Sequence, residues 1–432
     1  MDLCIIGVGY VGLVTGAVFA DLGNEMVCVD IIDEKIRQLN EGVIPIYEPG
    51  LEEMIHRNMK DRRISFTTSL EEGMRRAEII FICVGTPPKQ NGETDLSYVE
   101  AAAKGIARHL ERYKIIVNKS TVPVGTGDLV REIIERNRRM DVDFDVVSNP
   151  EFLREGSAIQ DTLSPDRIVI GAPNKRVAMR LLELYASLER PMIITDVHSA
   201  EMIKYASNAF LATKISFINA IADICERARA NVTDVAKGMG LDRRIGPEFL
   251  NAGLGFGGSC FPTDTESPVH TAAANGYEFE ILKATVKVNK ERCRHFIEVM
   301  REKLGPLQDK RIGVLGLAFK PDTDDMREAK SIEIIQELLK EGAEVLAYDP
   351  VAMENARRIL PDVVYCESSY DVAEGAEALV ILTEWREFRL LNMDKIKAAM
   401  KRPVIFDGRN IYDPEKKKKM GFEYYSIGRG QC

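Results

Sequence analysis

A glycine-rich loop leads to a cysteine whose surroundings suit nucleophilic chemistry. Four glycines fall within positions 253–258, and Cys260 follows two residues later. Glycine lets a substrate approach the backbone closely, and Pro262 suits the first turn of a helix. A helix N-terminus lowers the pKa of a nearby thiol, which matters because an ordinary thiol is only a few per cent thiolate at neutral pH. The pattern therefore favours Cys260 as a nucleophile over an inert loop residue.

Three other polar residues have a catalytic role in prospect only if Cys260 is a nucleophile. Lys204 and Asn208 are four residues apart and share one face of a predicted helix, while Asp264 follows Cys260 by four residues. Spacing alone favours a solvated lysine and a surface asparagine at the first two positions.

A second glycine pattern, Gly7-Val8-Gly9-Tyr10-Val11-Gly12, follows an apolar run and precedes a helical pattern at 13–22. In this context the first glycine permits a tight turn, the second admits a pyrophosphate, and the third lets helix pack on strand. Asp30 ends the next predicted strand, eighteen residues after Gly12. Its carboxylate suits ribose hydroxyls and repels a 2′-phosphate, so the pattern predicts NAD rather than NADP.

Three further strand ends should meet the same crevice, because ligands in parallel sheets lie outside the carboxyl ends of the strands. They are Gly85-Thr86-Pro87, Ser120–Pro123 and Asn149-Pro150-Glu151. For Thr86 and Thr121, ordinary turn chemistry is an equal alternative.

Apolar runs that alternate with helical patterns position these residues. Such alternation predicts a parallel sheet covered by helices on both faces. The strands expected in the N-terminal block lie within 3–9, 26–31, 77–87, 114–123 and 144–152, and the helices include 48–59 and 98–110.

The remainder divides into a helical block and a second alternating block. A long helix should run from Ser199, a suitable N-cap, to about residue 230. Strands are expected again within 310–319, 343–350, 378–385 and 402–410. Gly23 precedes Asp30 by seven residues, as Gly342 precedes Asp349, which indicates two related domains. We therefore predict an α/β fold: two doubly wound Rossmann-like domains, 1–197 and 301–432, joined by an all-helical domain, 198–300.

Composition narrows the class of protein. The net charge of −9 offers no basic excess for binding nucleic acid. The eight cysteines are scattered without a paired motif, so we expect no disulfide framework, no metal site and a reducing, cytoplasmic location. Four glycines interrupt the apolar N-terminal run, and no stretch is predicted to be a signal peptide or to cross a membrane.

With these residues and several longer motifs, the chain resembles the UDP-glucose 6-dehydrogenases, within the UDP-glucose/GDP-mannose dehydrogenase family. The resemblance runs essentially end to end. The motifs that carry it are GVGYVG at 7–12, Gly-Thr-Pro at 85–87, KSTVP at 119–123, NPEFLREGSA at 149–158, PDRIVIG at 165–171, KYASNAFLATKISFINA at 204–220, GFGGSCFPTD at 255–264, GLAFKPDTDDMREAKS at 316–331 and FDGRN at 406–410.

The resemblance implies roles for individual residues. Cys260 would form the covalent intermediate, Lys204, Asn208 and Asp264 would surround the substrate C6 and a water, and Arg244 would reach a neighbouring subunit's substrate. The implied catalytic residues are Cys260, Lys204, Asn208, Asp264, Thr121, Glu151 and Glu155. The implied cofactor contacts are Gly7, Gly9, Tyr10, Val11, Gly12, Asp30, Lys35, Gly85, Thr86, Pro87, Thr121, Glu155 and Arg327. The implied substrate contacts are Glu151, Phe152, Leu153, Lys204, Asn208, Arg244, Phe249, Phe256, Gly257, Phe319, Lys320 and Arg409.

The activity that the resemblance implies is a four-electron oxidation of UDP-glucose to UDP-glucuronate with two NAD, by a homodimer or higher oligomer formed through the central helix. The alternatives are a UDP-N-acetylmannosamine or GDP-mannose dehydrogenase, a one-step β-hydroxyacid dehydrogenase, and a non-catalytic NAD-binding protein or redox sensor. Two positions depart from the family pattern. Thr263 stands where lysine is common, and Pro268 is expected to interrupt the helix after Cys260.

Overall fold

The computed structural model describes residues 1–89 and 91–429, and the chain folds as two compact units. Unit 1 comprises Met1–Ser207 with Glu266–Tyr277, and unit 2 comprises Asn208–Thr265 with the chain from Glu278 onward. Helices α9 (Val197–Ala228) and α11 (Phe261–Ala274) each run from one unit into the other. The domain limits at 197/198 and 300/301 stay a prediction.

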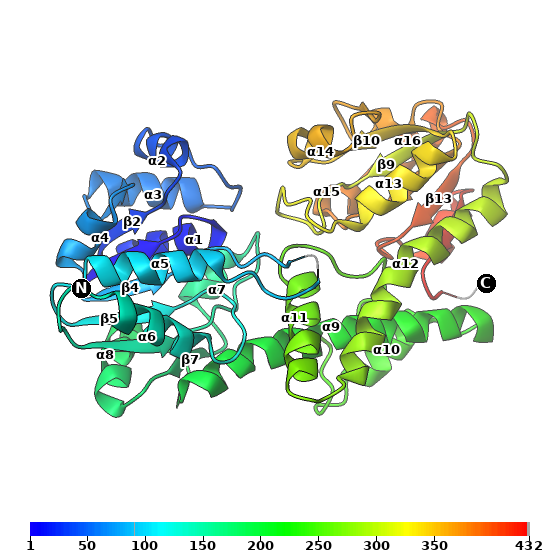
Figure 1. Cartoon of the computed structure of the whole chain (residues 1–432). Helices are drawn as coiled ribbons and strands as arrows, with labels where there is room; N and C mark the ends of the chain where they lie inside the picture. The colour runs from blue at the N-terminus through cyan, green and yellow to red at the C-terminus, as the bar shows by residue number, and fades with distance from the viewer. Residues whose placement is uncertain (90, 430–432) are drawn as a thin grey trace. The chain divides into compact units, whose positions relative to one another are not determined.

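Unit 1 is built on an eight-stranded sheet in the order β3-β2-β1-β4-β5-β6-β7-β8 (Figure 1). All neighbouring strands are parallel except β6 and β7, which pair antiparallel at Ser148 and Gly171. The strands are β1 (Asp2–Ile6), β2 (Glu25–Val29), β3 (Ile64–Thr67), β4 (Ile79–Ile82), β5 (Lys114–Asn118), β6 (Phe144–Ser148), β7 (Ile168–Gly171) and β8 (Met192–Thr195).

Helices cover both faces of this sheet because apolar side chains alternate along its strands. Leu3 and Ile5 pack on one side with α1, α2, α3, α7 and α8, while Cys4 and Ile6 pack on the other with α4, α5 and α6. The bounds of these helices are α1 (Tyr10–Asp21), α2 (Asp33–Asn40), α3 (Leu51–Lys60), α4 (Leu70–Arg76), α5 (Ser97–Arg108), α6 (Thr126–Asn137), α7 (Ala158–Leu163) and α8 (Lys175–Tyr185), followed by the 3₁₀ turn η1 (Ala186–Leu188).

Unit 2 repeats the pattern with a six-stranded, all-parallel sheet in the order β11-β10-β9-β12-β13-β14. Its strands are β9 (Arg311–Leu315), β10 (Glu344–Tyr348), β11 (Val364–Tyr365), β12 (Ala378–Ile381), β13 (Val404–Asp407) and β14 (Glu423–Ser426). Its other elements are α10 (Val232–Gly240), α12 (Glu280–Leu304), α13 (Lys330–Lys340), α14 (Met353–Ile359), η2 (Asp371–Ala373), α15 (Arg386–Arg389), α16 (Met393–Ala399) and α17 (Pro414–Lys419).

Two local predictions in the helical block were wrong. Helix α9 begins at Val197, and it is Asp196 whose carboxylate accepts from the Ser199 amide at 2.8 Å, so Ser199 is not the N-cap. Helix α11 continues through Pro268 to Ala274. A proline inside a helix removes one backbone hydrogen bond, and the remaining bonds of this helix sustain it.

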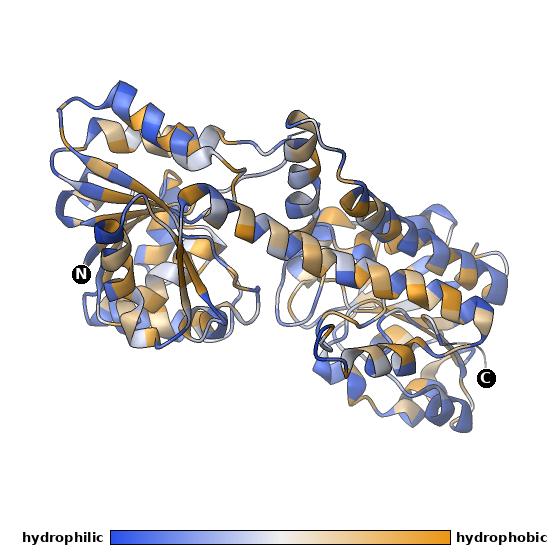
Figure 2. Cartoon of the chain, turned by 90° about the horizontal axis from the view of Figure 1, so that it is seen from below, coloured by the Kyte–Doolittle hydropathy of each residue, from blue (hydrophilic) through white to orange (hydrophobic). Residues whose placement is uncertain are grey.

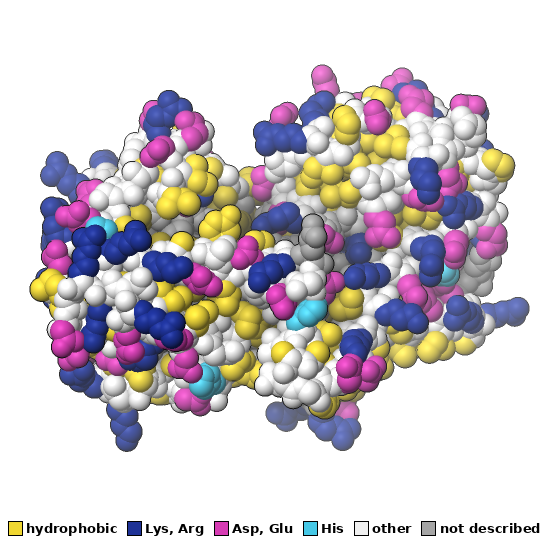
Figure 3. Space-filling view, viewed as in Figure 1, with side chains coloured by type: hydrophobic (Ala, Val, Ile, Leu, Met, Phe, Trp, Pro, Cys, Tyr) yellow, Lys and Arg dark blue, Asp and Glu magenta, His cyan; other side chains and the backbone are white. Residues whose placement is uncertain are grey.

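The predicted fold class is confirmed: two doubly wound sheets, with helices α9–α12 occupying the chain between β8 and β9. No helix in the described part of the chain combines the length and apolar character needed to cross a bilayer. Lysine and arginine side chains are intermixed with aspartate and glutamate over the face drawn in Figure 3.

Candidate active site

The three glycines of the first turn each meet a different steric requirement. Gly7 has a φ of +96°, and a Cβ there would lie 2.8 Å from the Cys83 carbonyl oxygen. A Cβ on Gly12 would lie 1.9 Å from the Gly7 carbonyl oxygen, so α1 packs too closely on the turn for any side chain. Around Gly9, by contrast, no atom lies within 4 Å of the Cβ position. The turn therefore leaves open space at the N-terminus of α1, where a pyrophosphate would bind.

Asp30 lies at the carboxyl end of β2, where it braces the same turn. Its Oδ2 accepts from the Val8 amide at 2.9 Å and from Lys35 Nζ at 2.9 Å, and its Oδ1 accepts from the Ile32 amide at 3.1 Å. The neighbouring Ile31 is 83% exposed. Asp30 itself is 8% exposed, and it lies at the carboxyl end of β2, where a ribose would approach the turn.

The ends of β4 and β5 are tied together by hydroxyl groups. Thr86 Oγ1 donates to the Thr121 carbonyl at 2.9 Å, and Ser120 Oγ donates to the Val84 carbonyl at 2.7 Å. The Thr86 hydroxyl therefore takes part in turn chemistry, the alternative that spacing left open. No atom lies within 4 Å of a Cβ built on Gly85, so the backbone here is accessible.

A buried ion pair lies beyond the end of β6. Lys204 Nζ donates to Glu151 Oε1 at 2.8 Å, and their side chains are 4% and 6% exposed. The Phe152 ring lies beneath two cations, with Arg167 Cζ 3.6 Å and Lys204 Nζ 5.5 Å from its centroid. Arg167 was missing from the predicted site. Arg167 and Phe152 lie in separate segments of the sequence, and only the fold brings them into contact.

Lysine 119 lies behind this pair. Its Nζ donates to Asn149 Oδ1 at 3.2 Å, and burial lowers the pKa of the Lys119 ammonium group. Glu155 is also buried, as Glu151 is, so both predicted glutamates lie in the protein interior.

In unit 2, Cys260 immediately precedes α11, as predicted. The Asp264 amide donates to the Cys260 carbonyl at 2.8 Å, and Asn208 Nδ2 donates to Asp264 Oδ2 at 2.6 Å. Cys260 is exposed, whereas the other described cysteines are buried or half-buried, and burial raises the pKa of Cys4 and Cys293 to about 12. Among the described cysteines, Cys260 is therefore the accessible one. Cys432 lies outside the described residues.

The glycine-rich loop is fastened by residues from distant segments. A Cβ on Gly257 would lie 2.2 Å from the Glu328 carbonyl oxygen, and a Cβ on Gly258 would lie 2.7 Å from the Phe319 ring. The Arg409 guanidinium donates to the carbonyls of Gly255 and Phe319, at 3.3 Å each. Three of the predicted substrate contacts, Gly257, Phe319 and Arg409, thus come together.

Two buried asparagines that sequence reasoning missed hold the loop in place. Asn219 Oδ1 accepts from the Gly253 amide at 2.8 Å, and Asn289 bonds both the amide and the carbonyl of Phe256. An asparagine at a buried helical position, as at Asn219 in α9, is the available sequence signal, since such a group needs a partner.

Other predicted residues lie at the surface of unit 2. Arg244 is paired with Asp242, and its side chain is 89% exposed. Arg327 forms a two-pronged pair with Asp325. The ring centroid of Phe249 lies 6.2 Å from that of Phe261, the first residue of α11.

Family models match three parts of the chain in order. The NAD binding domain of the UDP-glucose/GDP-mannose dehydrogenase family matches residues 1–189, its central domain 198–291, and its UDP binding domain 313–414. The chain belongs to this family. It is therefore an NAD-dependent dehydrogenase. Both the family that the sequence resembles and the predicted cofactor, NAD, are confirmed.

Relatives match over the full length. A UDP-glucose 6-dehydrogenase of Bacillus subtilis, TuaD, is 50% identical over 99% of this chain and 93% of its own. One from Rhizobium meliloti is 48% identical over 99% and 100%. Among solved structures, a UDP-glucose dehydrogenase from Pyrobaculum islandicum superposes with a TM-score of 0.92 at 41% identity, covering 100% of this chain and 98% of its own. A UDP-D-ManNAc dehydrogenase from Pyrococcus horikoshii gives 0.88 at 28% identity, with full coverage of both.

Proposed function

We propose that the chain oxidises UDP-glucose at C6 to UDP-glucuronate, with two NAD and one water, through a covalent intermediate on Cys260. The observation that carries the proposal is the exposed Cys260 at the start of α11, beside the Asn208–Asp264 hydrogen bond, in a glycine-rich loop. The relatives that are 48% and 50% identical over the whole chain are UDP-glucose 6-dehydrogenases, which supports the choice of sugar.

The first glycine turn fits NAD. Gly9 leaves room for the pyrophosphate at the N-terminus of α1, and Asp30 would accept hydrogen bonds from a ribose. Thr121 and Glu155 would lie by the nicotinamide. NAD, when bound, accepts a hydride in each of the two oxidations.

In the first oxidation, a water held by Asp264 and Lys204 takes the proton of the C6 hydroxyl, and the alcohol becomes an aldehyde. Lys204 and Asn208, one turn apart on α9, stabilise the negative charge that develops on the C6 oxygen. The pairing of Lys204 with Glu151 fixes the ammonium group for this role.

The second oxidation explains why a thiol is needed. An aldehyde does not readily give up a second hydride. The Cys260 sulfur therefore bonds to C6 and the aldehyde oxygen takes the proton that the thiol loses, which gives a thiohemiacetal. Loss of the second hydride and of the hydroxyl proton leaves a thioester. Water then breaks the sulfur–carbon bond, with Glu151 or Glu155 removing its proton, and releases the carboxylate and the free thiol.

A Cys260→Ser variant tests this chemistry. UDP-glucuronate formation should fall by about 10³-fold or more, while the dissociation constants for NAD and the UDP-sugar stay within about threefold of the parent. Cys366→Ser, at a half-buried cysteine elsewhere in unit 2, is the matched control and should keep parental activity. Undiminished acid production by Cys260→Ser would contradict the covalent route.

Structural neighbours include a UDP-D-ManNAc dehydrogenase at 28% identity, so other sugars of the family remain candidates. Rates with UDP-glucose, UDP-N-acetylmannosamine and GDP-mannose decide between them. A one-step β-hydroxyacid dehydrogenase would release one NADH per substrate, and a non-catalytic NAD-binding protein would release none.

We also propose that the chain forms a homodimer through α9. Phe210, Phe217 and Ile224 lie seven residues apart on this helix and are 65%, 49% and 56% exposed. Apolar residues along α9 appear in orange in Figure 2. A stripe at this spacing suits packing against a second helix. Arg244 would then serve the neighbouring subunit's substrate.

Light scattering tests the dimer. Phe217→Glu should shift the protein toward the monomer, because it places a charge in the stripe, whereas Leu390→Glu, at a 74% exposed residue on another surface, should not. A Phe217→Glu protein with the parental mass would contradict the proposal.

The proposal also assigns one function to each predicted domain: residues 1–197 bind NAD, 198–300 form the dimer, and 301–432 bind the UDP moiety.

A further inference from the structure

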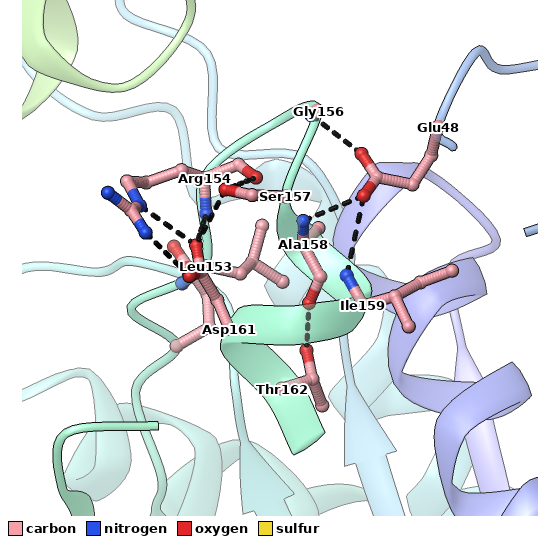
Figure 4. A network of polar contacts seen from close by, with 10 residues as sticks. Glu48, Leu153, Arg154, Gly156, Ser157, Ala158, Ile159, Asp161 and Thr162 are labelled. Carbon is pink, nitrogen blue, oxygen red and sulfur yellow. Dashed lines mark hydrogen bonds and ion pairs between the residues drawn. The ribbon is translucent and has the colours of Figure 1, made fainter. Parts of the chain in front are cut away.

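Glu48 is a buried carboxylate that joins two segments far apart in the sequence. It is 6% exposed and lies three residues before α3. Its Oε1 accepts from the Ala158 amide at 2.7 Å, and its Oε2 accepts from the Gly156 amide at 2.6 Å and from the Tyr10 hydroxyl. Figure 4 shows the side chain reaching the start of α7, where the Ile159 amide also donates at 3.4 Å.

The donors come from two parts of the proposed site. Tyr10 belongs to the glycine turn that fits NAD. Gly156 directly follows the segment 151–155, which carries both proposed catalytic glutamates. The Gly156 amide also donates to the Tyr10 hydroxyl at 2.9 Å, so Tyr10, Glu48 and Gly156 form a closed triangle of hydrogen bonds.

The charge of Glu48 is balanced by hydrogen-bond donors. Among the residues that the structure describes, no lysine or arginine forms an ion pair with Glu48, and backbone amides at the first turn of α7 face it instead. Burial and the bond to Glu48 raise the pKa of the Tyr10 hydroxyl, which therefore stays protonated as a donor.

The segment after residue 153 is also braced from within. Asp161 accepts from the Arg154 guanidinium at 2.7 and 2.9 Å and from the Arg154 amide at 2.9 Å, as Figure 4 shows. These bonds brace 154–161 from within, and Ala158 packs in the same hydrophobic core as the residues of α1. Glu48 adds a polar link from that segment to Tyr10, beside the direct bond from the Gly156 amide to Tyr10.

We infer that Glu48 is a positioning residue for hydride transfer: it holds the Gly156–Ile159 backbone against Tyr10 and thereby aligns the catalytic segment 151–155 with the NAD-binding turn. The inference rests on the proposed function, which gives Glu151 and Glu155 their roles. A carboxylate is required because all four of its partners donate. A glutamine would turn an NH₂ group toward two of those donors.

Kinetics of Glu48→Gln in the full chain test the inference. Because a misplacement of about 1 Å in a catalytic group can cost about 10²-fold, kcat should fall by about 10- to 100-fold. KM for UDP-glucose should stay within about threefold, because the UDP moiety is assigned to unit 2, and the dissociation constant for NAD should rise several-fold.

The control is Asn174→Ala, which removes a side-chain cap on α8 in the same unit, where Asn174 Oδ1 accepts from the Val177 amide at 3.0 Å. It should lower the melting temperature and leave kcat and NAD affinity unchanged. A Glu48→Gln protein that likewise loses only melting temperature, with kcat within twofold of the parent, overturns the inference.

If Glu48→Gln does not fold, Tyr10→Phe decides, because it breaks the triangle and leaves the backbone contacts of Glu48 in place. Its kcat should fall by at least about threefold, and a parental kcat overturns the inference. NAD affinity, measured by calorimetry without sugar, separates this inference from the proposed function. If the parent does not turn over UDP-glucose, the proposed function fails, while unchanged NAD affinity in both variants would refute the Glu48 link on its own.

Discussion

The first glycine turns of the two units have the same backbone geometry, but the segments that follow them differ. Gly7 and Gly316 have φ angles of +96° and +94°, and their amides donate to the Val29 and Tyr348 carbonyls at 2.8 and 2.9 Å. In unit 1, α1 begins three residues after the first glycine. In unit 2, α13 begins only at Lys330, after a long segment that places Phe319 against the loop before Cys260.

The aspartates that end the second strand of each sheet differ in the same way. Asp30 is 8% exposed, and it accepts from two backbone amides and from Lys35. Asp349 is fully buried, and its two oxygens accept from four backbone amides and from the Trp385 indole. Both carboxylates brace the turns beside them, but Asp349 has no exposed surface and holds a longer loop with five donors, whereas Asp30 keeps some exposure and is the proposed ribose acceptor. The same pattern of strand, glycine turn and aspartate thus carries the proposed NAD site in unit 1 and fastens the loop before α13 in unit 2.

Asp349→Ala should have the largest effect on the fold. Removal of this carboxylate leaves five donors, four of them buried, without their acceptor, so the free energy of unfolding of unit 2 should fall by about 3 to 5 kcal/mol. Urea unfolding followed by Trp385 fluorescence measures it. A loss below about 1 kcal/mol would show that Asp349 does not fasten the loop.

Asp30→Ala should act on binding instead. The free energy of unfolding should change by about 1 kcal/mol, and the affinity for NAD should fall by about tenfold or more because a charged ribose acceptor is lost. Calorimetric titration with NAD measures this, and Asp33→Ala at the exposed first position of α2 is the control. Parental NAD affinity in Asp30→Ala would show that Asp30 does not contact the ribose, and the two aspartates would then not differ in ligand binding.

Gly9→Ala should give the smallest change. The backbone at Gly9 is extended and its Cβ position is empty, so the fold should be unaffected within about 0.5 kcal/mol. NAD should bind about fivefold more weakly, since the methyl group enters the space for the pyrophosphate. Equal NAD titrations of variant and parent would place the pyrophosphate elsewhere.

Much of this architecture follows from local patterns. Apolar runs bounded by glycine, with an aspartate at the strand end, predict β1, β2, β9 and β10 and the turns between them. The short strands β3, β7, β8, β11 and β14 were not predicted, because runs of two to four residues at or near the sheet edges carry little periodicity.

The residues of the candidate site likewise fall into those that local sequence predicts and those that it does not. Gly9, Asp30 and Cys260 could be predicted as site residues because their proposed roles depend on adjacent residues. The roles of Asp349, Glu48 and Asn289 depend on partners that lie tens to more than a hundred residues away, and only the folded chain brings these together. Long-range hydrogen bonds leave no spacing pattern in a single sequence.

The proposed function is a four-electron oxidation, and NADH counting tests it most directly. With limiting UDP-glucose and excess NAD, absorbance at the NADH band measures the yield per sugar consumed. The proposed function predicts two NADH and one UDP-glucuronate for each UDP-glucose. One NADH with an aldehyde product, or none, would contradict it.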